Sequence, residues 1–201
     1  MGWDMRKIQQ KSKFLWVGNW PAIDFINTEI IADHNLVDLL QIPQDVIVWL
    51  AESRVSRKED LKSSPPRQLL EGARTYRGLL RNGIAAYVHR KPVSPSLTHQ
   101  TNHLLSQSVC ARRIVSEGKE YRVESHWRFD EPETYLVPIA ESFTKLITEA
   151  DRTRIRKCKN PECVLYFYDT SKGGKRTWCS LDLCGNKLRM AASRQRREEL
   201  L

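Results

Sequence analysis

The chain has 201 residues, 40% of them hydrophobic and six of them Trp, which suffices for the packed core of one sizeable domain and a small appendage. Its net charge of +9 is uneven, because residues 151–201 hold 13 Lys and Arg against six Asp and Glu, whereas residues 1–150 hold 20 against 18. No apolar run approaches a membrane span and no signal peptide is visible, so we expect a cytoplasmic protein that has no membrane partner and whose basic end faces a polyanion. The alternative is a solvated basic segment without a partner.

The first 60 residues predict short elements. Residues 14–18 read as a short strand, and residues 22–28 as a second strand or a first helical turn, with a turn between them. Residues 33–40 form another short segment. Pro43 is well placed in the first turn of a helix that buries Val46, Trp49 and Leu50 on one face.

Helical spacing dominates the middle of the chain. After the breaker Ser63-Ser-Pro-Pro66, apolar residues recur at helical spacing from Leu69 to Tyr87, and Ser96 is placed to cap a second helix. Residues 112–129 instead alternate between apolar and polar, which predicts a hairpin that turns at residues 116–119. A further helix is expected from Tyr135 to about Ile155.

The cysteines form two pairs near the end of the chain. Each pair is separated by four residues, Cys158 with Cys163 and Cys179 with Cys184, and the 15 residues between the pairs read as strand, Gly-Gly turn and strand. Such a hairpin would bring four thiolates around one ion, which is a closed, structural arrangement that suits Zn²⁺. The alternatives are iron, a redox switch built from the same thiols, and four buried cysteines without a ligand.

Basic residues surround this expected zinc module. A helix is predicted after Cys184, from about residue 187 to residue 200, and a basic turn precedes the second cysteine pair. The candidate nucleic-acid-binding residues on these two segments are Lys175, Arg176, Lys187, Arg189, Arg194, Arg196 and Arg197. Basic groups by themselves predict contacts with DNA phosphates and no choice of sequence.

Polar residues inside an apolar stretch mark a second candidate site, for a small-molecule effector. Asp24, Asn27 and Thr28 either line a ligand pocket in the body or satisfy buried backbone groups. The histidines show no metalloprotease spacing, Cys110 has no catalytic partner motif, and no nucleotide-binding loop or hydrolase motif is present. We therefore expect a protein that is not an enzyme.

Together these residues resemble the CGNR zinc-finger family, named for the tetrapeptide at its last metal ligand. The matching residues are Cys158, Pro161, Cys163, Phe167, Asp169, Arg176, Trp178, Cys179, Ser180, Cys184, Gly185 and Asn186. The fourth residue of the tetrapeptide is Lys187 here instead of Arg, so the planar fork of a guanidinium is lost at that position. Upstream, residues 23–28, the stretch through Pro43 and Trp49, and the helix from Leu69 are similar to the family's N-terminal ABATE domain.

The resemblance implies a bacterial transcription regulator, responsive to stress, whose zinc module binds DNA. We expect an α+β fold that is mainly α, with residues 1–155 as a helical, ABATE-like sensor or dimerisation body with short hairpins. Residues 156–201 would form a zinc-ribbon or treble-clef-like module of hairpin and helix. The competing hypotheses are a ligand- or protein-binding protein with a purely structural zinc, an RNA-binding module and an enzyme. A homodimer is compatible with the DNA-binding regulator, whose body would be the dimerisation domain.

Overall fold

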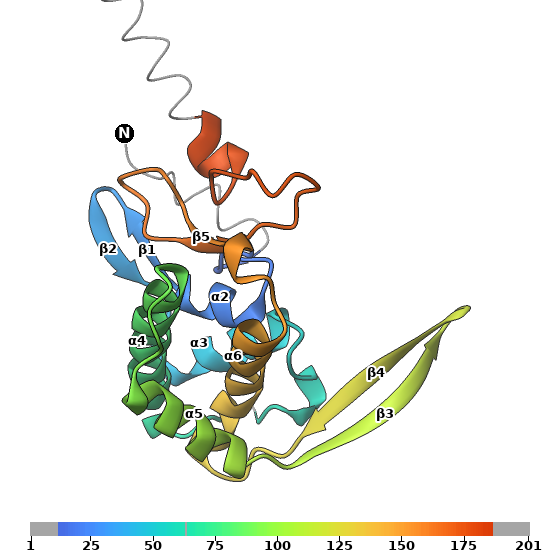
Figure 1. The fold of residues 1–201 in the computed structure, drawn as a ribbon. Helices are drawn as coiled ribbons and strands as arrows, with labels where there is room; N and C mark the ends of the chain where they lie inside the picture. Colours follow the sequence, from blue (N-terminus) through green and yellow to red (C-terminus); the bar gives the residue numbers. More distant parts are fainter. Residues whose placement is uncertain (1–11, 63, 187–201) are drawn as a thin grey trace, which may run out of the picture. The chain divides into compact units, whose positions relative to one another are not determined.

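The computed structural model describes residues 12–62 and 64–186 and divides them into two compact units (Figure 1). The first unit joins residues 12–38 to residues 151–186, and the second spans residues 39–150. No helix within the described ranges is both long enough and apolar enough to cross a membrane. The fold is α+β and mainly α, as the sequence predicts.

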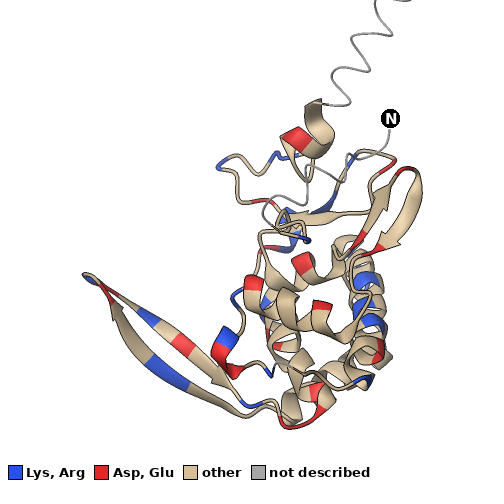
Figure 2. Ribbon diagram, turned by 180° about the vertical axis from the view of Figure 1, so that it is seen from behind, with Lys and Arg blue, Asp and Glu red and all other residues tan. Residues whose placement is uncertain are grey.

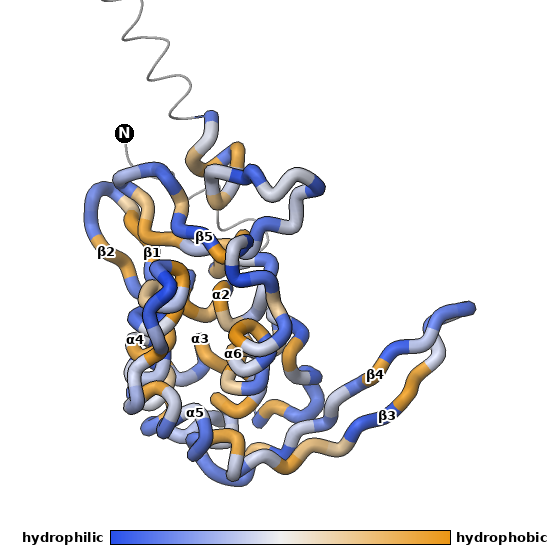
Figure 3. Tube along the Cα trace, viewed as in Figure 1, coloured by the Kyte–Doolittle hydropathy of each residue, from blue (hydrophilic) through white to orange (hydrophobic). Residues whose placement is uncertain are grey.

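Helices form the core of the second unit. Their bounds are α3 (Pro43–Glu52), η1 (Lys58–Asp60), α4 (Gln68–Val88), α5 (Pro95–Ser106), η2 (Pro132–Leu136) and α6 (Val137–Thr148). The long helix α4 packs against α3, α5 and η2, and its buried face carries the apolar residues of the predicted periodicity. Trp49, Tyr76 and Phe143 are fully buried in this unit. Figure 3 shows hydrophobic positions along α3 and α6.

The second unit also contains the predicted hairpin. Strands β3 (Cys110–Glu117) and β4 (Glu120–Trp127) pair in antiparallel register around Gly118, whose φ of +69° suits glycine. We call this hairpin the arm, because it extends away from the helices of its unit (Figure 1). Its base is fixed by Trp127, whose indole N–H donates to the Val55 carbonyl oxygen at 2.9 Å.

The first unit is built from short elements that are far apart in the sequence. Its elements are α2 (Pro21–Ile26), β1 (Glu29–Ala32), β2 (Asn35–Asp38), η3 (Arg152–Arg154), β5 (Ile155–Lys157), β6 (Tyr166–Tyr168) and η4 (Leu181–Gly185). Strand β1 pairs with β2, and β5 pairs with β6, both in antiparallel register. Helix α2 contacts β6, and its apolar residues Ile23 and Phe25 are completely buried. The N-terminal segment is therefore part of the core that supports the cysteines.

Several predicted elements differ from the structure. Residues 14–18 form no regular strand, and residues 21–26 are helical, since Pro21 opens a turn there. The α5 cap is Ser94 instead of Ser96, because the Ser94 hydroxyl accepts from the Leu97 N–H and Pro95 is the first helical residue. The last long helix ends at Thr148, earlier than predicted.

The cysteine module also differs in its strand pairing. We predicted that the strand after Cys163 pairs with the segment after the Gly-Gly turn, but β6 pairs with β5, which precedes Cys158. Residues 175–178 are not a strand. The predicted helix over residues 187–200 lies outside the described residues.

The compact units do not follow the predicted division at residues 155 and 156. Residues 12–38 group with the cysteine module, because the apolar residues of α2 pack on β6. An isolated module of this size buries little apolar surface, and the N-terminal segment supplies the missing core.

Candidate metal centre

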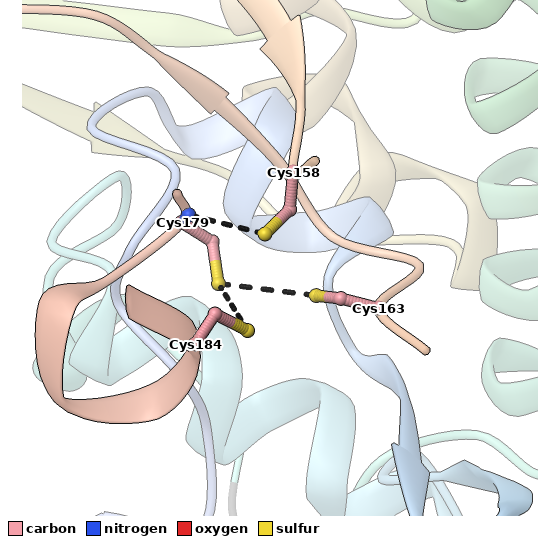
Figure 4. A group of neighbouring side chains, drawn as sticks. All are labelled: Cys158, Cys163, Cys179 and Cys184. Carbon is pink, nitrogen blue, oxygen red and sulfur yellow. Dashed lines mark hydrogen bonds between the residues drawn. The ribbon is translucent and has the colours of Figure 1, made fainter. Parts of the chain in front are cut away.

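The structure brings the four predicted metal ligands together (Figure 4). The first cysteine pair lies in the connection between β5 and β6, where the Cys158 N–H donates to the Leu165 carbonyl oxygen and the Cys163 N–H to that of Asn160. Cys184 lies on the helical turn η4, which Ser180 caps by accepting from the N–H groups of Asp182 and Leu183. All four thiols are buried.

The sulfur positions fit a tetrahedral zinc site. All four Sγ atoms lie within 4.8 Å of one another, with 3.9 Å between Cys163 and Cys179 and 3.6 Å between Cys179 and Cys184. Four sulfurs about 2.3 Å from one Zn²⁺ would be about 3.8 Å apart. A disulfide would bring two of them to about 2.0 Å, and none of the four is bonded to another. Cys158, Cys163, Cys179 and Cys184 would therefore hold the ion.

The protonation of the four thiols also favours a cation. Hydrogen bonding to Cys163 lowers the pKa of Cys158, whereas hydrogen bonding to Cys158 raises the pKa values of Cys163 and Cys179. Four thiols packed this closely cannot all ionise by themselves, because each thiolate repels the next. A divalent ion offsets that repulsion and lets all four act as thiolates.

Two N–H groups support the sulfurs from outside the ligand set. The Cys179 backbone N–H donates to the Cys158 sulfur, and the Asn160 side-chain amide donates to the Cys184 sulfur, each at 3.4 Å. Such donors orient thiolate ligands and offset their charge. Asn160 is buried, and it is not among the residues expected at the site from the sequence. The signal available was its position between the first two cysteines.

Asp24, Asn27 and Thr28 serve the fold of this unit. The Asn27 amide donates to the Tyr166 carbonyl oxygen at 2.8 Å, and its Oδ1 accepts from the Tyr166 N–H at 3.0 Å. The Asp24 carboxylate accepts from the Gly18 N–H at 2.7 Å, and the Thr28 hydroxyl donates to the Phe25 carbonyl oxygen. All three side chains are buried, so the structure favours the second interpretation of these residues, the satisfaction of buried backbone groups.

Arg176 has a structural role inside its unit. Its guanidinium lies 4.4 Å over the Phe167 ring and donates to the carbonyl oxygens of Val17, Trp178 and Cys179. The sequence predicts that Arg176 contacts nucleic acid, but its Nε and Nη2 donors are committed to these carbonyls. It is therefore left out of the contact surface that we propose below.

A loop held by several hydrogen bonds follows β6. Asp169 is completely buried, and its carboxylate accepts from the N–H groups of Ser171 and Arg176. Burial by itself would raise the pKa of Asp169, but hydrogen bonds from the Ser171 hydroxyl and from these N–H groups outweigh it and lower the pKa. The guanidinium groups of Arg154 and Arg156 donate to loop carbonyls, at 2.9 Å to Ser171 and 2.6 Å to Gly174.

Four lysines are exposed around this centre: Lys157, Lys159, Lys172 and Lys175. Figure 2 shows basic positions along the loop that carries the last two. None of the four forms an ion pair with another residue in the described ranges. The predicted contacts Lys187, Arg189, Arg194, Arg196 and Arg197 lie outside the described residues.

Two family models match the chain. The model described as "CGNR zinc finger" matches residues 154–197. The ABATE model, described as "Putative stress-induced transcription regulator", matches residues 19–150. No curated protein matches. The two matches meet close to the predicted domain boundary, although the compact units do not.

Proposed function

Because the chain belongs to the ABATE family and ends in a CGNR zinc finger, we propose that it is a transcription regulator whose zinc module binds duplex DNA through phosphate contacts. The observation that carries the proposal is the set of four exposed lysines around a closed metal centre. Lysines that form no ion pair within residues 12–62 and 64–186 are available to replace the counterions of a nucleic acid.

The lysines share one small scaffold. Lys157 ends β5 and Lys159 lies just beyond the first metal ligand, and the Lys159 N–H donates to the Thr177 carbonyl oxygen at 3.2 Å. This bond holds Lys159 beside the chain segment that carries Lys175, which lies two residues before Thr177. The hydrogen bonds of Asp169, Arg154 and Arg156 fix the same loop, so the ammonium groups are presented by a preorganised backbone.

In this proposal the zinc has a structural role. Four thiolates complete a tetrahedral shell and leave no position for water or substrate, which is the arrangement of structural zinc sites. The ion would hold the connection of β5 and β6 against η4, and thereby the lysines that flank these elements. We assign no catalytic activity to the protein.

Further basic residues follow Gly185 in the sequence and would enlarge the proposed DNA-contact surface. Lys187, Arg189, Arg194, Arg196 and Arg197 follow the last ligand directly, and their charge would add to that of the four lysines. The proposed surface assigns phosphate contacts only, since base contacts require groups that reach a groove edge.

The test is a fluorescence-anisotropy titration of a random-sequence duplex with the zinc-loaded protein. Replacing Lys172 and Lys175 by Gln should weaken binding roughly 60-fold at 0.1 M salt, because each phosphate contact contributes a factor of about 8 there. The matched control replaces Lys58 and Lys91, two exposed lysines of the other unit, and should leave binding unchanged. Equal losses in both variants, or no duplex binding by the parent protein, would refute the proposal and favour a zinc module that only closes the fold.

A further inference from the structure

The arm is the feature that the proposed function leaves unused. In its antiparallel register Ile114 lies opposite Val123 and Ser116 opposite Tyr121, and directly paired residues share a face. Ile114, Tyr121 and Val123 therefore form one line on the outer half of the arm, which we call the apolar row. These residues are 77%, 78% and 62% exposed.

The opposite face of the arm carries charged side chains that pair with one another, beside Val115. The Arg122 guanidinium contacts the carboxylates of Glu117 at 3.1 Å and Glu124 at 2.6 Å. Figure 2 shows positions of both signs along the arm, which carries four Lys and Arg against three Asp and Glu. One face of the arm is thus suited to water, whereas the apolar row is not.

A two-stranded ribbon of this kind needs a cover. Hairpins without a third strand or a packing partner are at best marginally stable in water, and large apolar side chains in one exposed line mark an interaction surface. Trp127 is buried and anchors the base of the arm to its unit. The apolar row lies beyond that anchor, on the outer half.

A cleft of about 500 Å³ lies beside the base of the arm. Its lining includes Gln107 and Glu131, three and four residues from the two ends of the arm, together with the buried apolar residues Leu69 and Leu136. The formal negative charges of this lining are those of Glu131 and Glu133. The cleft beside the base is therefore acidic and partly apolar, with Glu133 paired to His103 at 2.8 Å, and the tip of the arm carries the exposed, basic Lys119.

We propose that a second copy of this chain covers the apolar row, with the two arms antiparallel about a two-fold axis. In that arrangement each residue of the row packs on the row of the other copy, as an isologous interface requires. The same axis brings the tip of each arm to the base of the other, so that Lys119 approaches the carboxylates of Glu131 and Glu133. The charges then complement each other at both ends.

The charge of the arm argues for this occupant over a nucleic acid. The row itself is uncharged, and the arm is nearly neutral within a chain of net charge +9. A nucleic-acid contact would require a concentration of unpaired basic groups, whereas Arg122 is committed to two carboxylates. The uncharged row is complementary to a second copy of itself, and Arg112, on the same face toward the base, lies 3.9 Å from the Glu141 carboxylate of its own chain.

The area of the interface predicts a weak dimer. Eight residues at about 3.4 Å per residue make a ribbon about 27 Å long, and with a width of about 10 Å the two faces together cover roughly 540 Å². Stable interfaces bury about 1,200 Å² or more, so burial of the tips at the bases must supply the remainder. We infer a dimer that dissociates in the micromolar range.

Sedimentation equilibrium of the zinc-loaded chain over a concentration series tests this inference. Val123→Lys places two like charges inside the interface and should raise the dissociation constant of the dimer by at least tenfold. Val115→Lys makes the same change on the opposite face of the arm and is the matched control, expected to dimerise as the parent protein does. A parent protein that stays monomeric at several hundred micromolar, or two variants that behave alike, would overturn the inference.

A charge exchange tests the antiparallel arrangement separately. Lys119→Glu and Glu131→Lys should each weaken the dimer, and the chain that carries both changes should recover most of the loss. If the double variant loses as much dimer affinity as the two single variants lose together, the tips do not meet the bases and the proposed geometry is wrong.

Discussion

Asn27 links the N-terminal segment to the metal centre, and its removal should be costly. The side chain is 1% exposed and satisfies both backbone polar groups of Tyr166, three residues after the ligand Cys163. Asn27→Ala removes the hydrogen bonds that Asn27 makes with the buried N–H and the buried carbonyl of Tyr166, at about 1–3 kcal/mol each. Allowing for partial entry of water, we expect a loss of about 3 kcal/mol in the free energy of unfolding.

Urea denaturation of the zinc-loaded protein measures this loss, and hydrogen exchange of the Tyr166 amide reports it locally. The control is Asn35→Ala, because the Asn35 amide donates to the Asp33 carbonyl oxygen from an exposed position, and its loss should cost less than about 0.5 kcal/mol. If the two variants differ by less than about 1 kcal/mol, or if Tyr166 exchanges at the parent rate in Asn27→Ala, the structural role that we assign to Asn27 is wrong.

Three further predictions concern the same unit. Cys179→Ser, or removal of the metal by a chelator, should unfold the cysteine module while the helices of residues 39–150 persist. The reason is that structural zinc contributes on the order of 10 kcal/mol to the folding free energy of such a module. Hydrogen exchange measured by mass spectrometry distinguishes the two regions. Burial raises the pKa of Asp24 from 3.8 to about 7, so the folded state keeps a proton that the unfolded chain releases. The free energy of unfolding should therefore fall from pH 4 to pH 7 by at most about 4 kcal/mol, and Asp24→Asn should remove that part of the pH dependence in urea titrations. Gly18→Ala would place a Cβ 2.9 Å from the Asp24 backbone nitrogen and should lower the free energy of unfolding by about 1–3 kcal/mol. As the control, the Cβ of Gly78→Ala meets nothing within 4 Å, and this variant should raise the free energy of unfolding by up to about 1 kcal/mol. A Gly18 variant as stable as the parent would contradict the packing.

The metal ligands could be predicted because their chemistry is local. Two pairs of cysteines at equal spacing identify a four-thiolate site without knowledge of the rest of the fold. The strand pairing of the module could not be predicted in the same way. Strand β6 pairs with β5 instead of the segment after Gly174, and the Asn27 amide, 139 residues away, holds the Tyr166 backbone groups.

The helices of the second unit followed from their periodicity, since one face of α4 must be buried. The arm shows the limit of such patterns. Alternation predicted its strands and the side on which Tyr121 and Val123 lie, and an apolar side ordinarily faces a core. Here that side is exposed on the outer half, and only Trp127 is buried among the paired residues near the base. Periodicity gives the direction of a side chain, but it does not say which surface meets it.

The salt dependence of duplex binding tests the central claim most directly, because its slope counts phosphate contacts. We would compare the parent protein with a variant in which Lys157, Lys159, Lys172 and Lys175 are all Gln, both loaded with zinc, over a series of salt concentrations. If each lysine contacts a phosphate, the slope of log affinity against log salt should become shallower by about 3.6, or about 0.9 for each contact. Equal slopes for the two proteins would show that these lysines do not contact DNA and would contradict the account.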